Sequence, residues 1–227
     1  LIISLVVYDL SLKAEYLKGD YTNPYHDYNI LNYSGFDEIE LNASTAANII
    51  VVQGPFKVLA HPNSEDFLHV SKQGKRLVIN AVFPDHYKNI ITDHVLYISC
   101  PKLSLFKVDA RYIAHGTLVI DTVVKDMRWY STLITGFSLD SLRLQTDNAS
   151  NIVLENNRVN TLNGIIGQSN GSGSALTIGS NNKFASSNLD IRNKSQLVIK
   201  GPAIRDLNYH LADSATLVVN GAAVKHL

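Results

Sequence analysis

The stretch of sequence that decides the fold covers residues 189–219, LDIRNKSQLVIKGPAIRDLNYHLADSATLVV. It contains short aliphatic runs that come in pairs: residues 189–191 precede 197–199, and residues 207–209 precede 217–219. Small and polar residues separate the two runs of each pair. Alternation over so few residues, bounded by turn-forming side chains, indicates short β-strands and not helices.

Earlier copies of the same unit precede this stretch. Residues 142–144 lead to 152–154, and a weaker copy runs from 105–108 to 118–120. The second runs begin at 118, 152, 176, 197 and 217, in steps of 34, 24, 21 and 20 residues, and the first step leaves room for a degenerate coil around residues 129–133. One such unit cannot bury its own apolar face, so the repetition predicts coils that stack on one another in a β-solenoid.

The connections between the runs are rich in asparagine and serine, as at Asn148, Asn151, Asn156, Asn157, Asn181 and Asn182. Asparagine tolerates the left-handed backbone conformation that tight corners require, and its amide can bond to a like residue one coil away. The sequence therefore predicts an all-β chain with a right-handed β-solenoid (β-helix) in its C-terminal half. An antiparallel sandwich joined by hairpins is the alternative, since it also contains alternating runs.

Short strands and hairpins are expected before the solenoid, within one β domain over residues 36–227 (36–100 before the coils, 101–227 in them). Residues 1–19 are predicted to be the remnant of an apolar membrane anchor followed by a short helix, with a first β-strand as the alternative. The apolar run over residues 1–7 is too short to cross a bilayer, which takes about 20 residues. Residues 20–35 are rich in tyrosine and asparagine and are predicted to be a linker that its tyrosines pin to the domain.

The composition of the chain excludes some classes of partner and site. Basic and acidic residues both number 20, so no overall field attracts nucleic acid, and a nucleic-acid partner is not expected. The single cysteine, Cys100, can form neither an internal disulfide nor a structural zinc site. It follows an alternating run, and we expect it to be a small residue at the end of a strand.

Four stretches of the chain carry a resemblance to a known family: residues 36–41, the turn at Gly54 with residues 56–58, residues 74–79, and residues 95–103. Over about residues 36–222 the chain resembles the bacterial family described as putative auto-transporter adhesin, head GIN domain, found mainly in envelopes of Bacteroidetes. It departs from the family pattern in having one clear Gly-Ser-Gly turn, at residues 171–173. The resemblance implies a β-helical envelope domain and supplies no catalytic residues.

Two kinds of side chain are candidates for metal binding or catalysis. The Asp85-His86 and Asp93-His94 pairs, with His61 or His115, contain metal-ligating groups, but their spacing matches no short ligand motif. Acids are also spread through the central coils, and a sugar-cleaving enzyme needs two of them facing one groove. Because Lys and Arg are interspersed, we interpret these acids as outward, solvated residues. They are Asp109, Asp121, Asp126, Asp140 and Asp147.

Aromatic residues are the binding candidates: Tyr112, Trp129 and Tyr130 gather with Phe137 around the degenerate coil. Such rings stack on sugars or anchor protein contacts, and the alternative is that they cap the core. We predict no catalytic residue, no metal site and no cofactor.

The predicted function is a non-catalytic binding or scaffolding module of the cell envelope, an adhesin in type. We expect it to be periplasmic or surface-exposed and membrane-anchored, with an envelope protein or glycan as partner. Membrane attachment through residues 1–19 and homo-oligomerisation stay open. A β-helix polysaccharide lyase or glycosidase is the first alternative function, and an envelope sensor or accessory protein is the second.

Overall fold

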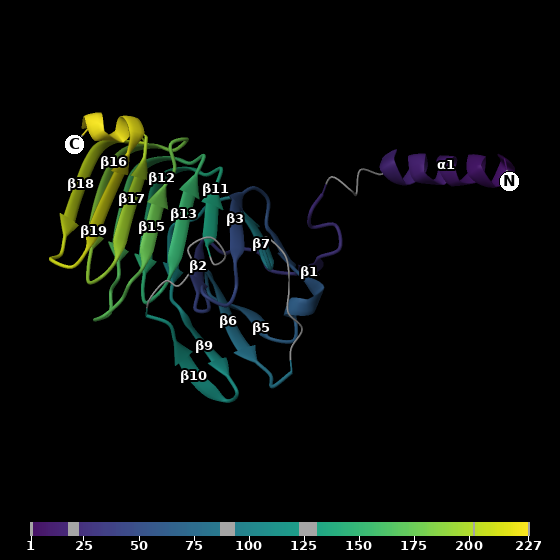
Figure 1. The fold of residues 1–227 in the computed structure, drawn as a ribbon, viewed down its shortest axis with the longest axis horizontal. Helices are drawn as coiled ribbons and strands as arrows, with labels where there is room; N and C mark the ends of the chain where they lie inside the picture. Colours follow the sequence, from purple (N-terminus) through teal and green to yellow (C-terminus); the bar gives the residue numbers. More distant parts are fainter. Residues whose placement is uncertain (1, 18–22, 87–93, 123–130, 202, 227) are drawn as a thin grey trace.

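The computed structural model describes residues 2–17, 23–86, 94–122, 131–201 and 203–226. Apart from the helix α1 and two short 3-10 helices, the regular structure of the described residues is β-strand (Figure 1). The elements are α1 (Ile2–Leu17), β1 (Asn29–Leu31), β2 (Glu38–Leu41), β3 (Ile49–Gln53), β4 (Lys57–Ala60), η2 (Pro62–Ser64), β5 (Leu68–Gln73), β6 (Arg76–Phe83), β7 (Leu96–Cys100), β8 (Leu105–Val108), β9 (Arg111–Ala114), β10 (Thr117–Ile120), β11 (Thr132–Thr135), β12 (Ser138–Thr146), β13 (Asn151–Glu155), β14 (Arg158–Ile166), β15 (Ala175–Ile178), β16 (Lys183–Ile191), β17 (Gln196–Lys200), β18 (Ile204–Leu211), β19 (Thr216–Asn220) and η3 (Gly221–His226).

The strands form two sheets. One has the order β1-β4-β7-β3-β11-β13-β15-β17-β19, and the other has the order β10-β9-β6-β2-β8-β12-β14-β16-β18, with β5 paired to β6. From β11 onwards, successive strands alternate between the two sheets, and each pairs in parallel with the strand two places along the chain. The hairpin-joined sandwich is therefore wrong for residues 131–220 as far as they are described.

The predicted stacking of aliphatic runs is confirmed for four of the five second runs. Ile152 pairs with Leu176, Leu176 with Leu197, and Leu197 with Leu217. The prediction is wrong for the run at Leu118, which belongs to β10 and pairs antiparallel with β9. The ladder instead continues from β13 to β11, which contains Leu133 from the expected degenerate coil, whereas residues 129 and 130 of that coil lie outside the described residues.

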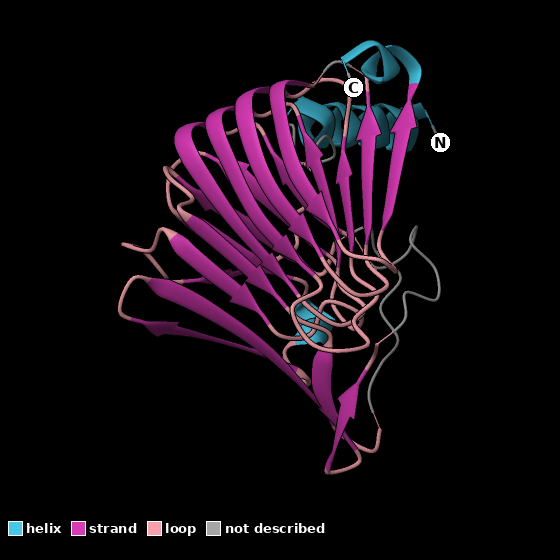
Figure 2. Ribbon diagram, turned by 90° about the vertical axis from the view of Figure 1, so that its left-hand side faces the viewer, coloured by secondary structure: helices cyan, strands magenta, loops and turns pink. Residues whose placement is uncertain are grey.

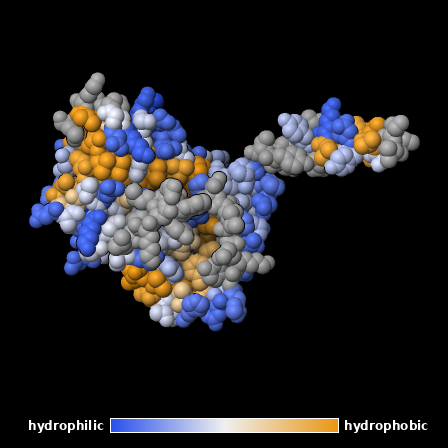
Figure 3. Space-filling model, viewed as in Figure 1, coloured by the Kyte–Doolittle hydropathy of each residue, from blue (hydrophilic) through white to orange (hydrophobic). Residues whose placement is uncertain are grey.

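The β9–β10 hairpin leaves the stack and has an apolar surface of its own. Leu118 and Ile120 are 57% and 50% exposed. Figure 3 shows the apolar patch over this hairpin, which lies at the bottom of the view in Figure 1. An alternating run of four residues fits a hairpin strand as well as a coil strand, so the pattern alone could not separate them.

The long strands β12, β14, β16 and β18 bend within their length, as Figure 2 shows. In β14, Val159 is buried and the next buried residue is Leu162, three positions later, after which burial alternates by two. A three-residue step reverses which side of the strand faces inward, so the strand must turn between these positions to keep both side chains in the core. β16 repeats the step between Phe184 and Ser187.

One continuous apolar core lies between the two sheets. It extends from Phe36 to Ala223 and includes side chains from the strands before and after residue 100. The early strands join the same parallel ladders, because β2 pairs in parallel with β6 and β8, and β3 pairs in parallel with β7 and β11. The predicted hairpin around Gly74 is confirmed as β5–β6, but hairpins are only part of this region.

The corners of the stack hold buried polar side chains. Asn157 Nδ2 donates to Ile134 O at 2.9 Å and to Asn182 Oδ1 at 3.0 Å, so this corner links β11 to the turns that follow β13 and β15. The left-handed conformation expected of corner asparagines is confirmed at Asn148 and Asn156, whose φ angles are 52° and 55°, but the buried Asn157 and Asn182 do not adopt it. Asn193, which was not among the predicted corners, has a φ angle of 55°. The opposite corner is lined by small hydroxyl residues. They are Ser44, Ser150, Ser172, Ser174 and Ser195.

The predicted linker is held against the domain by tyrosines. The hydroxyl of Tyr28 donates to the carbonyl of His94 at 2.6 Å, and that of Tyr33 donates to the carbonyl of Val70 at 2.6 Å. Residues 29–31 also form a strand, β1, paired antiparallel with β4.

The N-terminal segment is the helix α1, so the alternative of a first strand is wrong. Figure 1 shows α1 apart from the strands, and its apolar side chains, among them Leu5, Val7 and Leu10, are exposed. No helix within the described residues has both the length and the apolar character needed to cross a membrane.

Candidate binding face

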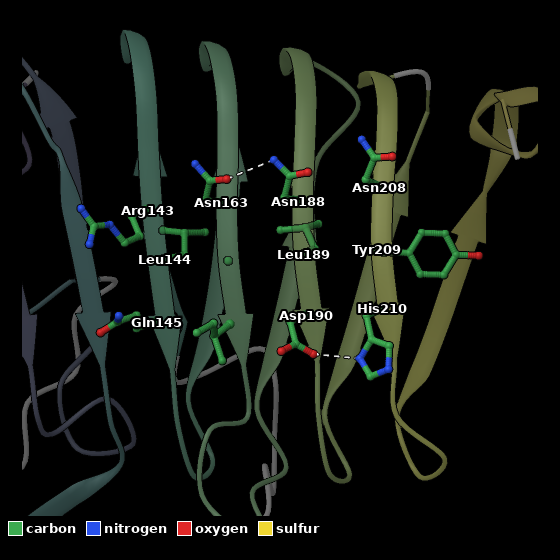
Figure 4. A pocket seen from close by; sticks show the side chains of 12 residues that line it. Arg143, Leu144, Gln145, Asn163, Asn188, Leu189, Asp190, Asn208, Tyr209 and His210 are labelled. Carbon is green, nitrogen blue, oxygen red and sulfur yellow. Dashed lines mark hydrogen bonds and ion pairs between the residues drawn. The ribbon is translucent and has the colours of Figure 1, made fainter.

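A groove of about 460 Å³ lies on the outer face of the sheet, across β12, β14, β16 and β18 (Figure 4). All of its lining residues come from these four strands, and the facing sheet contributes none of them. They are Arg143, Leu144, Gln145, Asn163, Gly164, Ile165, Asn188, Leu189, Asp190, Asn208, Tyr209 and His210. The groove is thus a surface of the stack and not a gap in its core.

The strand register arranges the lining in three rows that run across the strands. The first outward row is Arg143, Asn163, Asn188 and Asn208, and the second is Gln145, Ile165, Asp190 and His210. Between them runs the inward row of Leu144, Gly164, Leu189 and Tyr209. Because successive residues of a strand face opposite sides, the outward rows supply side chains to the groove and the inward row supplies its backbone floor.

The asparagines of the first row form a partial ladder. Asn188 Nδ2 donates to Asn163 Oδ1 at 3.2 Å, as Figure 4 shows. Each carboxamide carries two N–H donors and an oxygen that accepts twice. Asn163 Nδ2 and Asn188 Oδ1 have no side-chain bond to another described residue, and neither has the amide of Asn208. This row therefore offers several donors and acceptors to a ligand.

Charge in the groove is uneven. Asp190 Oδ2 accepts from Arg192 Nε at 2.7 Å, and Asp190 Oδ1 lies 3.0 Å from His210 Nδ1. The hydrogen bond from Arg192 is the main cause that holds the pKa of Asp190 below its ordinary value; partial burial opposes it and His210 adds to it. Arg143, at the other end, forms no ion pair with a residue that the structure describes. The unpaired charge of the groove is positive.

Over β2, β6 and β8, the outward charged side chains on the same sheet are paired with one another. Arg76 lies 2.8 Å from Glu38 and 3.0 Å from Glu40, and Lys107 lies 3.0 Å from Glu40. Burial raises the pKa of Glu40, but the hydrogen bonds and charges of Lys107 and Arg76 outweigh burial and lower it. Here outward side chains satisfy one another, whereas over β12–β18 they leave bonding capacity open.

The predicted aromatic binding residues do not line this groove. Tyr112 is half-buried in β9 and packs edge-to-face on Phe83 at 5.6 Å, and Phe83 stacks on Phe67 at 4.6 Å. Tyr112 therefore covers the edge of the core, which was the alternative role. Trp129 and Tyr130 lie outside the described residues.

The histidine pairs separate in space. His115 Nδ1 lies 2.9 Å from Asp85 Oδ1, both on the surface. His94 instead lies beside Tyr25, with Nδ1 3.4 Å from its hydroxyl, and His61 Nδ1 accepts from the backbone of Asn63. Asp93 is outside the described residues, and within those described no cluster of three metal-ligating side chains forms.

The candidate acids are engaged in the framework. Asp109 is 1% exposed, accepts from Asn148 Nδ2 at 2.6 Å and pairs with Arg111, so its interpretation as an outward residue is wrong. Burial of a carboxylate is tolerated because these partners compensate its charge. Asp121 accepts from Thr45 Oγ1 at 2.7 Å.

Asp147 and Asp140 accept hydrogen bonds from residues 22 and 20 positions later in the chain. Asp147 accepts from the backbone of Ser169 at 2.8 Å, and Asp140 accepts from Asn160 Nδ2 at 3.1 Å on the surface. Asp126 lies outside the described residues.

Cys100 is buried at the end of β7, as expected. Burial raises the pKa of its thiol to about 12, so it carries no thiolate at neutral pH. It is a packing residue.

The groove itself was missed from sequence, although a signal was present. Asn163, Asn188 and Asn208 recur at steps of 25 and 20 residues, which is close to the spacing of the aliphatic runs. A polar residue that recurs at the period of the stack marks one outward row, because residues at equivalent positions of neighbouring strands face the same side of the sheet.

Comparison with known proteins gives structural similarity only. No family model matches the chain, and no curated protein matches it significantly. A crystal structure of a putative adhesin from Bacteroides fragilis aligns with a TM-score of 0.40 and 15% identity, over 85% of this chain and 96% of that one. Putative adhesins from Parabacteroides distasonis and Parabacteroides merdae each align with a TM-score of 0.35, at 12% and 13% identity, over 85% and 86% of this chain and 96% and 95% of theirs.

Proposed function

We propose that the chain is a non-catalytic binding or scaffolding module of the cell envelope, adhesive in type, and that it binds through the groove on the outer face of β12–β18. The observation that supports this most is the set of unused amide donors and acceptors arranged along that groove. Exposed amides on a rigid sheet lose little conformational freedom on binding, so their hydrogen bonds go largely into affinity.

We also propose the finer fold, a right-handed β-solenoid of the head GIN type. Its support is the pairing pattern: every strand from β11 to β17 pairs in parallel with the strand two places later, in the same sheet. Two successive strands, one from each sheet, then make one turn of a coil, and each coil rests on the one before it. A crystal structure of the chain tests the hand and the coil geometry directly.

The groove favours binding over turnover. Glycoside cleavage in most families uses a pair of carboxyl groups about 5–10 Å apart. Among the described residues that line the groove, Asp190 is the single carboxylate, and Arg192 and His210 occupy both of its oxygens. The envelope partner is therefore proposed to be a glycan or protein that is held and not cut.

The envelope location is supported by α1. Leu5, Val7 and Leu10 are each more than half exposed, and exposed apolar surface of this kind favours contact with a membrane or another apolar surface. We propose that α1 attaches the module peripherally. Flotation of the full chain with phospholipid vesicles tests this, with Leu5→Glu as the variant expected to lose binding.

The function is tested by measuring retention of bacterial envelope fractions on the immobilised full chain. A groove variant, R143Q/N188A, should lose retention, whereas R158Q/N160A, with the same substitutions on the same sheet outside the groove, should keep it. Bound material recovered with unchanged length supports binding without turnover. Equal retention by both variants, or steady release of cleaved sugars, contradicts the proposal.

A further inference from the structure

The groove runs across the strands, and this direction limits the kinds of ligand that fit it. Its two outward rows run across four parallel strands, and neighbouring strands in a sheet lie about 4.8 Å apart. A ligand that makes the same contact with each strand must therefore repeat at about that distance along the row.

This spacing separates two kinds of linear polymer. An extended peptide advances about 3.3 Å per residue, and its side chains on one face repeat at twice that length, so neither period keeps step with the strands. A pyranose linked through equatorial bonds advances by about one strand spacing per sugar. A linear polysaccharide lying across the strands can thus present one sugar to each.

The chemistry of the first row suits sugars. A hydroxyl group both donates and accepts, and so does a carboxamide. With Asn188 bonded to Asn163, the ladder still presents Asn163 Nδ2, Asn188 Oδ1 and the whole amide of Asn208 outward. In the second outward row, the side chain of Ile165 adds an apolar surface on which a sugar ring can pack.

The charge of the groove adds a second requirement. Arg143 is an exposed guanidinium without an ion-pair partner among the described residues, at the β12 end of the amide row. Guanidinium groups bind carboxylates in a bidentate manner. The only acid in the described lining, Asp190, is already compensated by Arg192. A carboxylate on the ligand therefore meets attraction and no uncompensated repulsion.

We propose that the groove binds a linear polysaccharide that contains uronic-acid sugars, with its chain running across β12, β14, β16 and β18. The asparagine row contacts the sugar hydroxyls, and Arg143 binds a carboxylate. This inference rests on the proposed function, because it names the ligand class of the same face.

Calorimetric titration of the full chain with β-1,4-linked oligomannuronates of two to six sugars, whose bonds are equatorial at both ends of each ring, tests the proposal. Affinity should rise with length and level off at about four sugars, since four strands line the groove. The methyl-esterified oligomers, which keep the hydroxyls but lack the charge, should bind about tenfold more weakly at low salt.

Matched variants assign the contacts. R143Q should abolish the preference for the acid over the ester, and R158Q should keep it. N163A/N188A should weaken both forms about tenfold or more, as expected for two lost hydrogen bonds, and N160A should not. Asn160 lies on β14 as Asn163 does and is exposed, but it is not part of the groove.

Several results would overturn the inference. They are the absence of binding by any oligomer at millimolar concentration, equal affinity for acid and ester, no dependence on length, and equal loss in groove and control variants. If envelope fractions still bind through the groove while these oligomers fail to compete, the ligand is of another class, such as a protein, and the proposed function stands without the polysaccharide. If envelope binding is also independent of the groove, both fail.

Discussion

Replacing Asn182 with alanine tests whether buried asparagines hold the corner of the stack. The Asn182 side chain is 2% exposed. Its Oδ1 accepts from the backbone N–H of Asn157 and from Asn157 Nδ2, both at 3.0 Å. Its Nδ2 donates to the carbonyls of Leu154 and Gly179 at 2.7 and 2.8 Å. Alanine removes all four bonds at a site that water does not reach.

The expected change in the free energy of unfolding depends on which buried groups lose their last hydrogen-bond partner. The carbonyl of Leu154 still accepts from Gly179 N at 2.9 Å, and the carbonyl of Gly179 still accepts from the backbone N–H of residue 182 at 3.3 Å. The backbone N–H of Asn157 keeps none of the bonds to Asn182, and a buried unsatisfied donor costs about 1–3 kcal/mol. With about 0.5–1 kcal/mol for each weakened carbonyl, N182A should lower the free energy of unfolding by about 3 kcal/mol.

Urea unfolding followed by circular dichroism measures the change. With a slope of about 3 kcal/mol per molar urea, the midpoint should fall by about 1 M. The control is Asn181→Ala, at the adjacent exposed residue, which should change stability by less than about 0.5 kcal/mol. Equal effects of the two substitutions would refute the assignment of the corner bonds as a main source of stability between neighbouring parallel strands.

Three further predictions concern single sites. At Gly167, with φ of 83° and an added Cβ 2.7 Å from the carbonyl of Arg192, alanine should destabilise the chain by about 2 kcal/mol or more, whereas alanine at Gly171, with φ of 80° and open space, should cost about 1 kcal/mol in the same unfolding assay. Cys100, whose thiol pKa burial raises to about 12, should resist iodoacetamide at pH 8 in the native protein and react after unfolding, as read by mass spectrometry. Because Arg192 lowers the pKa of Asp190, their contact stabilises the fold above the ordinary value near pH 4 and is lost as pH falls through the lowered pKa; R192Q should raise that pKa in an NMR titration.

The repeat was predictable from sequence because burial in a stack imposes periodicity. The runs at Ile152, Leu176, Leu197 and Leu217 stack as their spacing predicted, because each must bury an aliphatic face that only its neighbours can cover. The sequence pattern does not show which other strand each run pairs with. Leu118 belongs to an equally regular run, yet it lies in a hairpin.

The early strands show the same limit. Hairpins were expected from the turn residues, and Gly74 does form one, but β2 and β3 also join the parallel ladders. Parallel pairing joins residues far apart in the chain, here 38 positions between Glu38 and Arg76, and leaves no local turn signal.

The candidate site was hidden for a different reason. Histidines, acids and aromatic residues can be recognised in a sequence by their distinctive chemistry. The outward amides of the groove cannot, because the role of an amide depends on the direction in which its side chain points. Asn157 and Asn163 lie six residues apart in one strand region, yet Asn157 is buried with its bonds used inside the stack and Asn163 faces the groove. Residue type alone cannot distinguish these roles.

The two uses of asparagine support each other physically. Corner amides such as Asn157 and Asn182 fix the relative positions of neighbouring parallel strands, because their bonds reach from one turn of the ladder to the next. These fixed positions in turn set the spacing of the outward amides at Asn163 and Asn188, which a polymeric ligand would have to match. A variant that loosens the corner without unfolding the chain should therefore weaken binding of long oligomers more than of short ones. Only a long ligand contacts several strands at once, so only its affinity depends on their relative positions.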